Sequence, residues 1–426
     1  MAMTSLVMII VILAILLVIG VPISYSIGIA SLFTILQTVP LDISVVTGAQ
    51  RIFVGMSKFS LTAIPFFILA GNLMNQGGIA KRLVNFVMAI LGKLPGALLV
   101  TNVGANALFG AISGSASAAA AAVGSMVREG EEEQGYDVAL CAATNGASAP
   151  SGLLIPPSNA LITYSLAAGG TSVAALFMAG YIPGIIWALA CMVVAIIIAK
   201  KKGYKGTPGK FSWANLGKAT LQAIPSLSLI IVVIGGIIAG VFSATEGSAI
   251  AVVYALILGI CYRNISLKSF WDIVVDSAKM SGMVVFLIGV SNILGWVMAF
   301  LQIPQAVSAA LLGITNNQYV ILLIAGTFMD VTPAILIFTP LFLPIVQTFG
   351  MDPIHFGLVL VYNLCIGNIT PPVGNTLFVA IKVGRSTLAK TMPYMLWYYV
   401  AILVGLLLVT YIPAISMILP QLAGLA

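Results

Sequence analysis

The chain has 426 residues, of which 61% are hydrophobic and only 7% are charged. Soluble domains carry about 25% charged residues, so the composition excludes an ordinary water-soluble domain. Charged residues are missing from Ala2 to Leu41, from Met280 to Met329 and from Thr391 to the C-terminus. Each stretch exceeds the roughly 20 apolar residues that cross a bilayer. The sequence therefore predicts an all-α polytopic membrane protein that lies in a lipid bilayer.

The residues needed for nucleic-acid binding, metal clusters, disulfide frameworks or catalysis are not found in the sequence. The formal net charge is +7, but the basic residues gather beside the apolar segments and form no continuous stripe, so we expect no nucleic acid partner. A single histidine, His355, and four cysteines without paired spacing indicate neither a metal cluster nor a disulfide framework. No nucleophile–base pair or nucleotide-binding loop is present, so we expect no enzyme.

Residues 1–200 are predicted to form the first of two repeats. Their first apolar block lacks a basic n-region, so it reads as a first helix and not as a cleaved signal peptide. The stretch that starts at Gly96 is too long for one span and too short for two, which favours a re-entrant hairpin. In chain order the expected elements are two scaffold spans, an amphipathic arm at 42–59, a span at about 61–80, a hairpin at about 96–128, a broken helix at about 136–170 and a final span at about 172–199.

A basic run from Lys200 to Lys210 marks the midpoint, and the positive-inside rule predicts a cytoplasmic linker at 201–220. Residues 221–426 are predicted to form the second repeat, of opposite orientation. Arg51 and Lys58 violate the rule on the outer side, but they lie on an interfacial amphipathic arm that resembles the arm at 264–280 in the other half. The expected elements are spans at about 221–243 and 245–262, an arm at 264–280, a span at about 281–301, a hairpin at about 303–349, a broken helix at about 356–382 and a final span at about 391–418.

Two Pro-Pro segments resemble each other, Gly-Leu-Leu-Ile-Pro-Pro-Ser-Asn-Ala-Leu from Gly152 and Gly-Asn-Ile-Thr-Pro-Pro-Val-Gly-Asn-Thr-Leu from Gly367, with one residue gapped. The two segments lie about 215 residues apart, and such internal similarity between the two halves of a chain is typical of inverted-repeat transporters. Two adjacent prolines remove two amide donors, so each helix must break. Unwound backbone at membrane depth persists only where protein or a cavity covers it, and its carbonyls can bind Na⁺. A simple proline kink is the alternative.

The tips of the two predicted hairpins hold small polar residues around Ser113 and Asp330. A small-residue helix contact could explain the first tip. Asp330 in an apolar run costs at least about 2.5–3.5 kcal/mol unless it is paired, and Na⁺ is a suitable partner; hydration near the outer surface is the alternative. We predict two coupling Na⁺ ions, one held by Ser113, Ser115 and the carbonyls of Gly152, Ile155 and Pro157, the other by Asp330, Thr332, Gly367, Thr370 and Pro372.

No Arg or Lys is expected near the membrane midplane, so an anionic substrate must be held by helix N-termini, hydroxyls and amides. Both asparagines at the half-helix starts could instead serve as helix caps. The acidic run Glu129–Glu133 is interpreted as a solvated cytoplasmic turn. The predicted substrate-binding residues are Ser158, Asn159, Gly374, Asn375 and Thr376.

At these residues the chain resembles the large membrane subunit of the tripartite ATP-independent periplasmic (TRAP) transporters, the DctM-like family. The resemblance rests on four segments that begin at Ile64, Gly110, Ser148 and Gly367. It implies an elevator-type carrier in the bacterial inner membrane, a separate small four-helix membrane subunit and a periplasmic substrate-binding protein. It also implies a small organic acid as substrate, of the sialic acid or C4-dicarboxylate class, with the sialic-acid branch looking closest.

Two rival classes share some of these features. A stand-alone Na⁺/dicarboxylate symporter would have hairpins and broken helices but no binding protein. A membrane enzyme would need several ionisable groups at one level, and Asp330 alone does not supply them.

Overall fold

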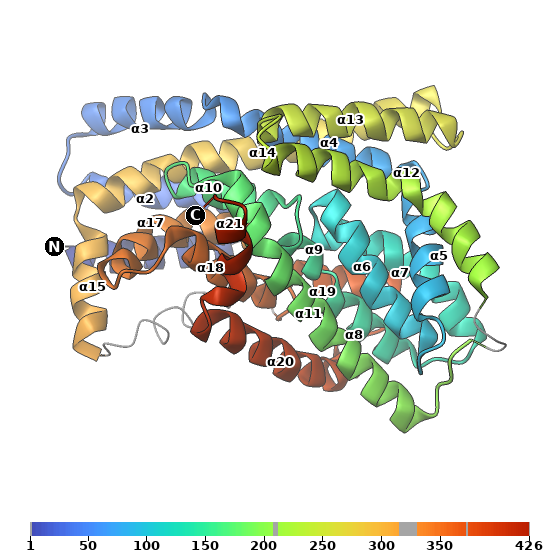
Figure 1. Ribbon diagram of the computed structural model, residues 1–426. Coiled ribbons are helices and arrows are strands. Elements are labelled where there is room, and N and C mark those ends of the chain that lie inside the picture. The colour runs from blue at the N-terminus through green and yellow to red at the C-terminus, as the bar shows by residue number, and fades with distance from the viewer. Residues whose placement is uncertain (1, 208–211, 315–329, 372–373, 426) are drawn as a thin grey trace.

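The computed structural model describes residues 2–207, 212–314, 330–371 and 374–425, and every regular element in these ranges is a helix (Figure 1). Within these ranges, 6 helices are long and apolar enough to cross a membrane, or up to 8 if each bent pair counts as one span. The prediction of an all-α polytopic membrane protein with broken helices is therefore confirmed.

In the first half, helix α5 was not predicted. Its apolar residues recur at helical spacing, and one face of the helix is buried. The basic residues Lys81 and Arg82 lie in its first turn, where the sequence predicts the end of a span. The helices are α1 (Ala2–Val18), α2 (Ile23–Ile35), α3 (Leu41–Met56), η1 (Phe59–Thr62), α4 (Ala63–Gln76), α5 (Ile79–Leu91), α6 (Ala97–Ser113), α7 (Ala116–Glu133), α8 (Val138–Ser148), α9 (Ser151–Leu154), α10 (Asn159–Ala167) and α11 (Val173–Lys202).

The described helices of the second half are α12 (Trp213–Ile238), α13 (Ala244–Cys261), α14 (Leu267–Phe300), α15 (Ile303–Ile314), α17 (Val331–Thr348), α18 (Pro353–Gly367), α19 (Asn375–Val383), α20 (Leu388–Tyr411) and α21 (Ala414–Leu422). The division into repeats at 1–200 and 221–426 remains a prediction.

Three boundaries differ from expectation. The arm and span predicted separately at 264–280 and 281–301 form the single helix α14, because no proline interrupts this stretch. In the first half the matching arm and span bend by 60° between Met56 and Phe59. The linker expected at 201–220 is shorter, since α12 begins at Trp213, and the last span ends at Tyr411 before Pro413.

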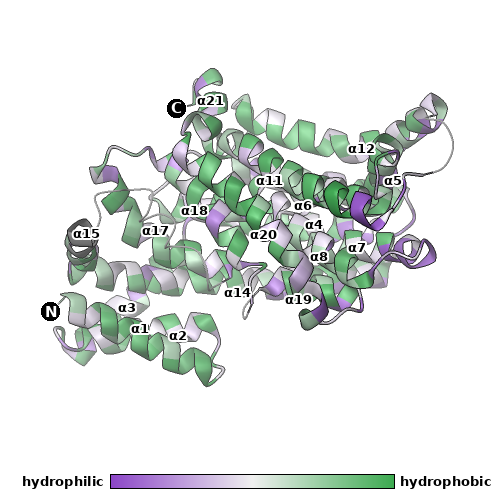
Figure 2. Cartoon of the chain, turned by 90° about the horizontal axis from the view of Figure 1, so that it is seen from below, coloured by the Kyte–Doolittle hydropathy of each residue, from purple (hydrophilic) through white to green (hydrophobic). Residues whose placement is uncertain are grey.

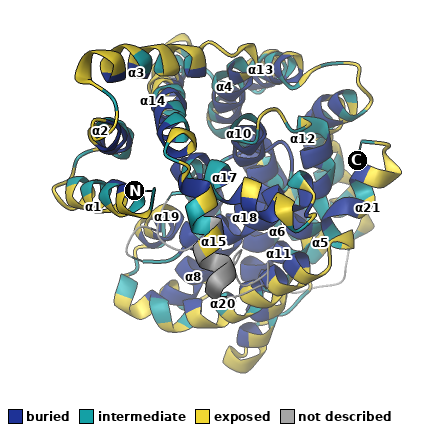
Figure 3. Cartoon of the chain, turned by 90° about the vertical axis from the view of Figure 1, so that its left-hand side faces the viewer, coloured by how far each residue is buried: buried dark blue, intermediate teal, exposed yellow. Residues whose placement is uncertain are grey.

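The helices form layers around a buried centre. In Figure 1, α3, α4, α13 and α14 lie along one side and α20 along the opposite side. Figure 3 shows α6 and α18 dark blue in the interior, while α1, α3 and α20 carry exposed residues. Helix α18 is buried at every residue from Ile354 to Gly367. Figure 2 shows hydrophobic colour over most helices and hydrophilic colour at the loops near α5 and α7, as expected for helices that face lipid.

A close backbone contact joins the first hairpin to the first broken helix. A Cβ atom added to Gly152 in α9 would lie 2.2 Å from the Cα of Gly110 in α6. One added to Gly110 would lie 2.6 Å from the Cα of Gly152. Only two glycines permit this approach, which brings the hairpin against the break.

Candidate functional site

The first hairpin turns at Gly114, whose φ of +62° suits glycine. Ser115 then caps α7, and its Oγ accepts a hydrogen bond from the amide of Ala118 at 3.4 Å. Helix α4 lies directly against this turn, because a Cβ on Gly71 would come 2.8 Å from the carbonyl oxygen of Ser113. The tip is thus held between α4 and the rest of the hairpin.

The first broken helix runs from α8 through the single turn of α9 to α10, with a bend of 49°. Ile155 is extended, and the Pro156–Pro157 peptide bond is cis. Ser158 satisfies both sides of the break: its Oγ donates to the carbonyl of Leu153 and accepts from the amide of Leu161 at 3.3 Å. Ser158 is therefore the N-cap of α10.

The second half repeats this arrangement with a carboxylate. Asp330 is the N-cap of α17, and its Oδ1 accepts from the amide of Val331 at 2.9 Å. Asn375 is the first residue of α19. On the α18 side of the break, the Thr370 hydroxyl donates to the carbonyl of Ile366 at 2.7 Å, and the Tyr399 hydroxyl of α20 donates to that of Ile369 at 2.6 Å.

These elements enclose a cavity of about 220 Å³. Among the described lining residues, Asp330 is the only charged one. The lining residues come from α4, the first hairpin, the start of α17, both interrupted helices and α14: Ile64, Ile68, Gly71, Asn72, Ser113, Gly114, Ser115, Ala116, Ser117, Ala118, Leu153, Asn159, Ala160, Thr163, Met280, Val284, Asp330, Val331, Thr332, Asn368 and Asn375.

The structure therefore brings together residues that the sequence assigned to two Na⁺ ions and a substrate. Those that line the cavity are Ser113, Ser115, Asn159, Asp330, Thr332 and Asn375. Those that do not line it are Gly152, Ile155, Pro157, Ser158, Gly367, Thr370, Gly374 and Thr376. Pro372 lies outside the described residues. The binding roles of all these residues remain predictions.

Sequence reasoning missed two asparagines of the cavity, Asn72 and Asn368. Asn72 also donates a hydrogen bond to the Ser277 hydroxyl of α14 at 2.8 Å. An amide in the middle of the apolar segment of α4 was a usable signal, since polar groups inside a span are expensive. The lining residues Met280 and Val284 carried no such signal, because they look like any lipid-facing or packing residue.

The free polar atoms of the cavity are mainly acceptors. The side-chain oxygens of Asn159 and Asn368 are buried and have no hydrogen-bond partner among the described residues. With the carboxylate of Asp330 and the hydroxyls of Ser113 and Thr332, they supply the neutral and anionic oxygens that a hard cation prefers. The described residues contain no cluster of three or more His, Cys, Asp or Glu side chains for a transition metal.

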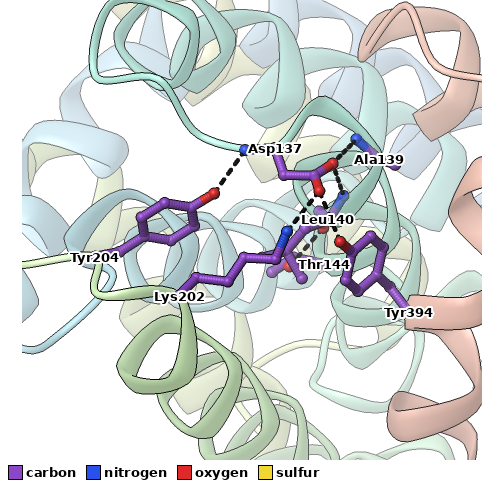
Figure 4. A network of polar contacts seen from close by, with 7 residues as sticks. All are labelled: Asp137, Ala139, Leu140, Thr144, Lys202, Tyr204 and Tyr394. Carbon is purple, nitrogen blue, oxygen red and sulfur yellow. Dashed lines mark hydrogen bonds and ion pairs between the residues drawn. The ribbon is translucent and has the colours of Figure 1, made fainter.

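A separate polar network surrounds Asp137, between α7 and α8 (Figure 4). Its Oδ2 accepts from the ammonium of Lys202 and from the hydroxyl of Tyr394, both at 2.6 Å. Its Oδ1 caps α8 by accepting from the amide of Ala139 at 2.9 Å, and its own amide donates to the Tyr204 hydroxyl at 2.9 Å. The network joins α8, α11 and α20 away from the cavity.

One expectation near this network is wrong. Glu131 belongs to the acidic run interpreted as a solvated turn, yet it is only 5% exposed. The run is the last part of helix α7, so one of its four glutamates turns toward the interior beside Cys141. Glu132 instead forms an exposed ion pair with Arg128 at 3.2 Å.

A polytopic helical fold in which the first hairpin tip, the start of α17 and two interrupted helices meet at one cavity is typical of a membrane permease of the secondary-transporter type. The family model of the tripartite ATP-independent periplasmic transporter, DctM component, matches residues 10–415. The chain therefore belongs to this family of TRAP transporter large permeases, which are transporters and not enzymes.

The alignments with similar proteins cover nearly the whole chain. It is 49% identical over 416 residues to YgiK of Salmonella typhimurium, covering 96% of this chain and 95% of that one. It is 40% identical to the isethionate TRAP transporter permease protein DctMQ of Oleidesulfovibrio alaskensis, covering 95% of this chain and 64% of that longer one. It is 37% identical to the C4-dicarboxylate TRAP transporter large permease protein DctM of Rhodobacter capsulatus, covering 95% and 96%.

The sequence identities do not favour the sialic acid permeases over the permeases for isethionate or C4-dicarboxylates. The sialic acid TRAP transporter large permease protein SiaM of Vibrio cholerae is 34% identical, with 95% of each chain covered. Among solved structures, the YdaH transporter of Alcanivorax borkumensis matches with a TM-score of 0.60 and 15% identity, covering 87% of this chain and 88% of that one. That likeness concerns the fold alone.

Proposed function

We propose that this chain imports a small organic acid across the bacterial inner membrane in symport with Na⁺. The observation that carries the proposal is the charge of the cavity, since Asp330 is the only charged residue in the described part of its lining. A carboxylate substrate placed beside Asp330 without a cation would be repelled at close range. Bound Na⁺ removes this repulsion, so ion binding and anion binding become coupled.

The substrate class follows from the relatives, which are named for isethionate, C4-dicarboxylates and sialic acid. All three are small organic acids. The substrate's acidic group would be held by amides and hydroxyls such as those of Asn159, Asn375 and Ser115, in the absence of a cationic side chain from this lining. A monovalent acid carried with two Na⁺ moves one net positive charge, worth about 2.3 kcal/mol per 100 mV.

The proposal includes partners and a mode of movement. The family supports a small four-helix membrane subunit and a periplasmic binding protein that delivers the substrate. The hairpins and broken helices would move together as one elevator-type body past α4 and α14, which form the other wall of the cavity. Co-purification of a small membrane subunit separates this function from that of a stand-alone symporter.

The test is uptake into proteoliposomes that contain the chain and its membrane partner, with loaded binding protein outside. Isethionate, succinate and sialic acid are supplied as radiolabelled probes. Uptake of at least one should require an inward Na⁺ gradient and collapse when K⁺ replaces Na⁺. Equal uptake in both salts would refute the coupling.

A further inference from the structure

A second cavity, of about 390 Å³, lies between the amphipathic arm and the helices of the candidate site. Its lining includes Arg51 of α3 and Lys58 at the bend between α3 and η1. The volume falls in the range of roughly 300–1,000 Å³ that is usual for small-molecule sites. None of the described residues that line this cavity is acidic.

The two cations of this cavity are unpaired. Neither Arg51 nor Lys58 has a hydrogen-bond or ion-pair partner among the described residues, although the end of helix α10 lines the same cavity. Carbonyls at a helix C-terminus attract cations, but no hydrogen bond to them is formed here. These are also the two basic residues that are predicted on the outer side of the membrane, against the positive-inside rule. Both residues are exposed, and no acid faces them among the described lining residues, so their charges are open to an anionic ligand.

The wall that carries the cations is rigidly attached to α14. A Cβ on Gly55 of α3 would lie 2.5 Å from the side-chain nitrogen of Asn292, and one on Gly289 would lie 2.6 Å from the Cγ of Met56. Such close packing leaves little freedom for α3 to move relative to α14. The opposite wall is formed by α10 and by Leu336 and Pro340 of α17.

The second cavity lies next to the first along three shared helices. Along α10, Thr163 lines the first cavity and Leu166 the second. Along α14 the corresponding pair is Val284 and Ile288, and along α17 it is Thr332 and Leu336. Each pair is separated by about one helical turn, or roughly 5.4 Å along the axis. The two cavities thus follow one another along α10, α14 and α17.

We propose that the second cavity is an anion-binding vestibule, in which Arg51 and Lys58 hold the acidic group of an organic acid one helical turn before the Asp330 cavity. The direction of passage rests on the proposed function. The chemistry recognised is a carboxylate, sulfonate or phosphate oxyanion, so the headgroup of an anionic lipid is a possible second source. The cations lie in the vestibule and not in the first cavity. They can therefore attract the substrate without remaining bound to it during transport.

The vestibule is testable without transport, because Trp296 lines it. The protein is placed in phosphatidylcholine nanodiscs, and quenching by iodide is compared with quenching by neutral acrylamide. The difference between wild type and Trp296→Phe gives the contribution of Trp296. We expect Arg51→Gln/Lys58→Gln to lower the iodide quenching constant of Trp296 about threefold or more while leaving acrylamide quenching unchanged. Isethionate or succinate should relieve iodide quenching in the wild type only.

The control is Lys205→Gln/Lys218→Gln, which removes two exposed cations from outside both cavities and should behave like wild type. Equal iodide quenching in wild type and Arg51→Gln/Lys58→Gln would overturn the proposal. Relief by phosphatidylglycerol in the nanodisc, with none by isethionate or succinate, would assign the site to a lipid headgroup and overturn the organic-acid assignment. An acrylamide change would reveal altered folding, in which case the single variants Arg51→Gln and Lys58→Gln decide by the same criterion.

Because this assay needs neither Na⁺ nor uptake, its outcome is independent of the Na⁺-replacement experiment. In proteoliposomes, the double variant should raise the KM for substrate about tenfold with kcat nearly unchanged, and high ionic strength should reduce the difference. An unchanged KM at low ionic strength would contradict the role in substrate entry.

Discussion

Asn159 donates a hydrogen bond from its side-chain nitrogen to the carbonyl oxygen of Gly114, at 3.4 Å. The contact joins the first residue of α10 to the turn of the first hairpin. Capping, the alternative role considered for Asn159, belongs instead to Ser158. Asn375 likewise follows its N-cap position, Gly374, and lines the cavity together with Asp330. In both halves the asparagine that starts a half-helix thus lies at the cavity.

This separation of roles gives a matched pair of variants. Asn159→Ala should reduce uptake about tenfold or more with little change in thermal stability, because it removes an amide from the cavity wall. Ser158→Ala should cost about 1 kcal/mol of stability through loss of the cap, with a smaller effect on uptake. Thermal unfolding and uptake are measured on both proteins. Normal uptake by Asn159→Ala with loaded binding protein would contradict a role in the site.

The helix breaks were predictable because their cause is local. A Pro-Pro pair blocks helical hydrogen bonding whatever its surroundings, so Pro156–Pro157 located the break before α10. Charge-free stretches likewise identified spans, because lipid excludes charge independently of the neighbouring helices. The two residues predicted at hairpin tips, Ser113 and Asp330, both line the cavity. Part of the second predicted hairpin, residues 315–329, lies outside the described residues.

Features that depend on tertiary packing were not predictable. The burial of Glu131 depends on which face of α7 meets α8, and nothing in the local sequence specifies it. The cavity wall formed by Met280 and Val284 depends on where α14 crosses the tips. The vestibule needs α3 to fold back against α14, which Gly55 permits but does not by itself predict.

Replacement of Asp330 tests the cation site. Asp330→Asn keeps the size of the side chain but removes its charge, so the Na⁺ concentration for half-maximal uptake should rise about tenfold or more. Asp352→Asn is the control, because Asp352 also caps a helix, α18, and lines neither cavity. Uptake is measured from limiting to saturating Na⁺. Identical Na⁺ curves for wild type and Asp330→Asn would exclude Asp330 as a ligand.

The close approach of α6 and α9 predicts a steric defect. Gly110→Ala should destabilise the protein by about 1–3 kcal/mol, because the new methyl group meets the backbone of Gly152 and no side chain can move aside. Gly217→Ala is the control: no atom lies within 4 Å of its added Cβ, and it sits in helix α12. It should be neutral or stabilising by up to about 1 kcal/mol. Equal thermal stability of Gly110→Ala and wild type would show that the hairpin and α9 can separate.

The Asp137 network predicts a dependence of stability on acid. Burial raises the pKa of Asp137, but hydrogen bonds from Lys202 and Tyr394, the amide of Ala139 and the charge of Lys202 together lower it to about 2. A carboxyl whose pKa falls on folding stabilises the protein above its unfolded pKa of about 3.9. That stability should be lost as the pH falls from about 4 to about 2.

Two substitutions divide this contribution. Asp137→Asn retains a side-chain oxygen for the cap of α8 and removes the ion pair with Lys202, so it should cost about 1 kcal/mol near neutral pH and reduce the acid dependence. Asp137→Ala also removes the cap and should cost about 1 kcal/mol more. Thermal unfolding of the three proteins between pH 7 and the acid limit of the detergent measures both effects. If wild type and Asp137→Asn lose stability in parallel as the pH falls, the acid sensitivity arises from other carboxyl groups.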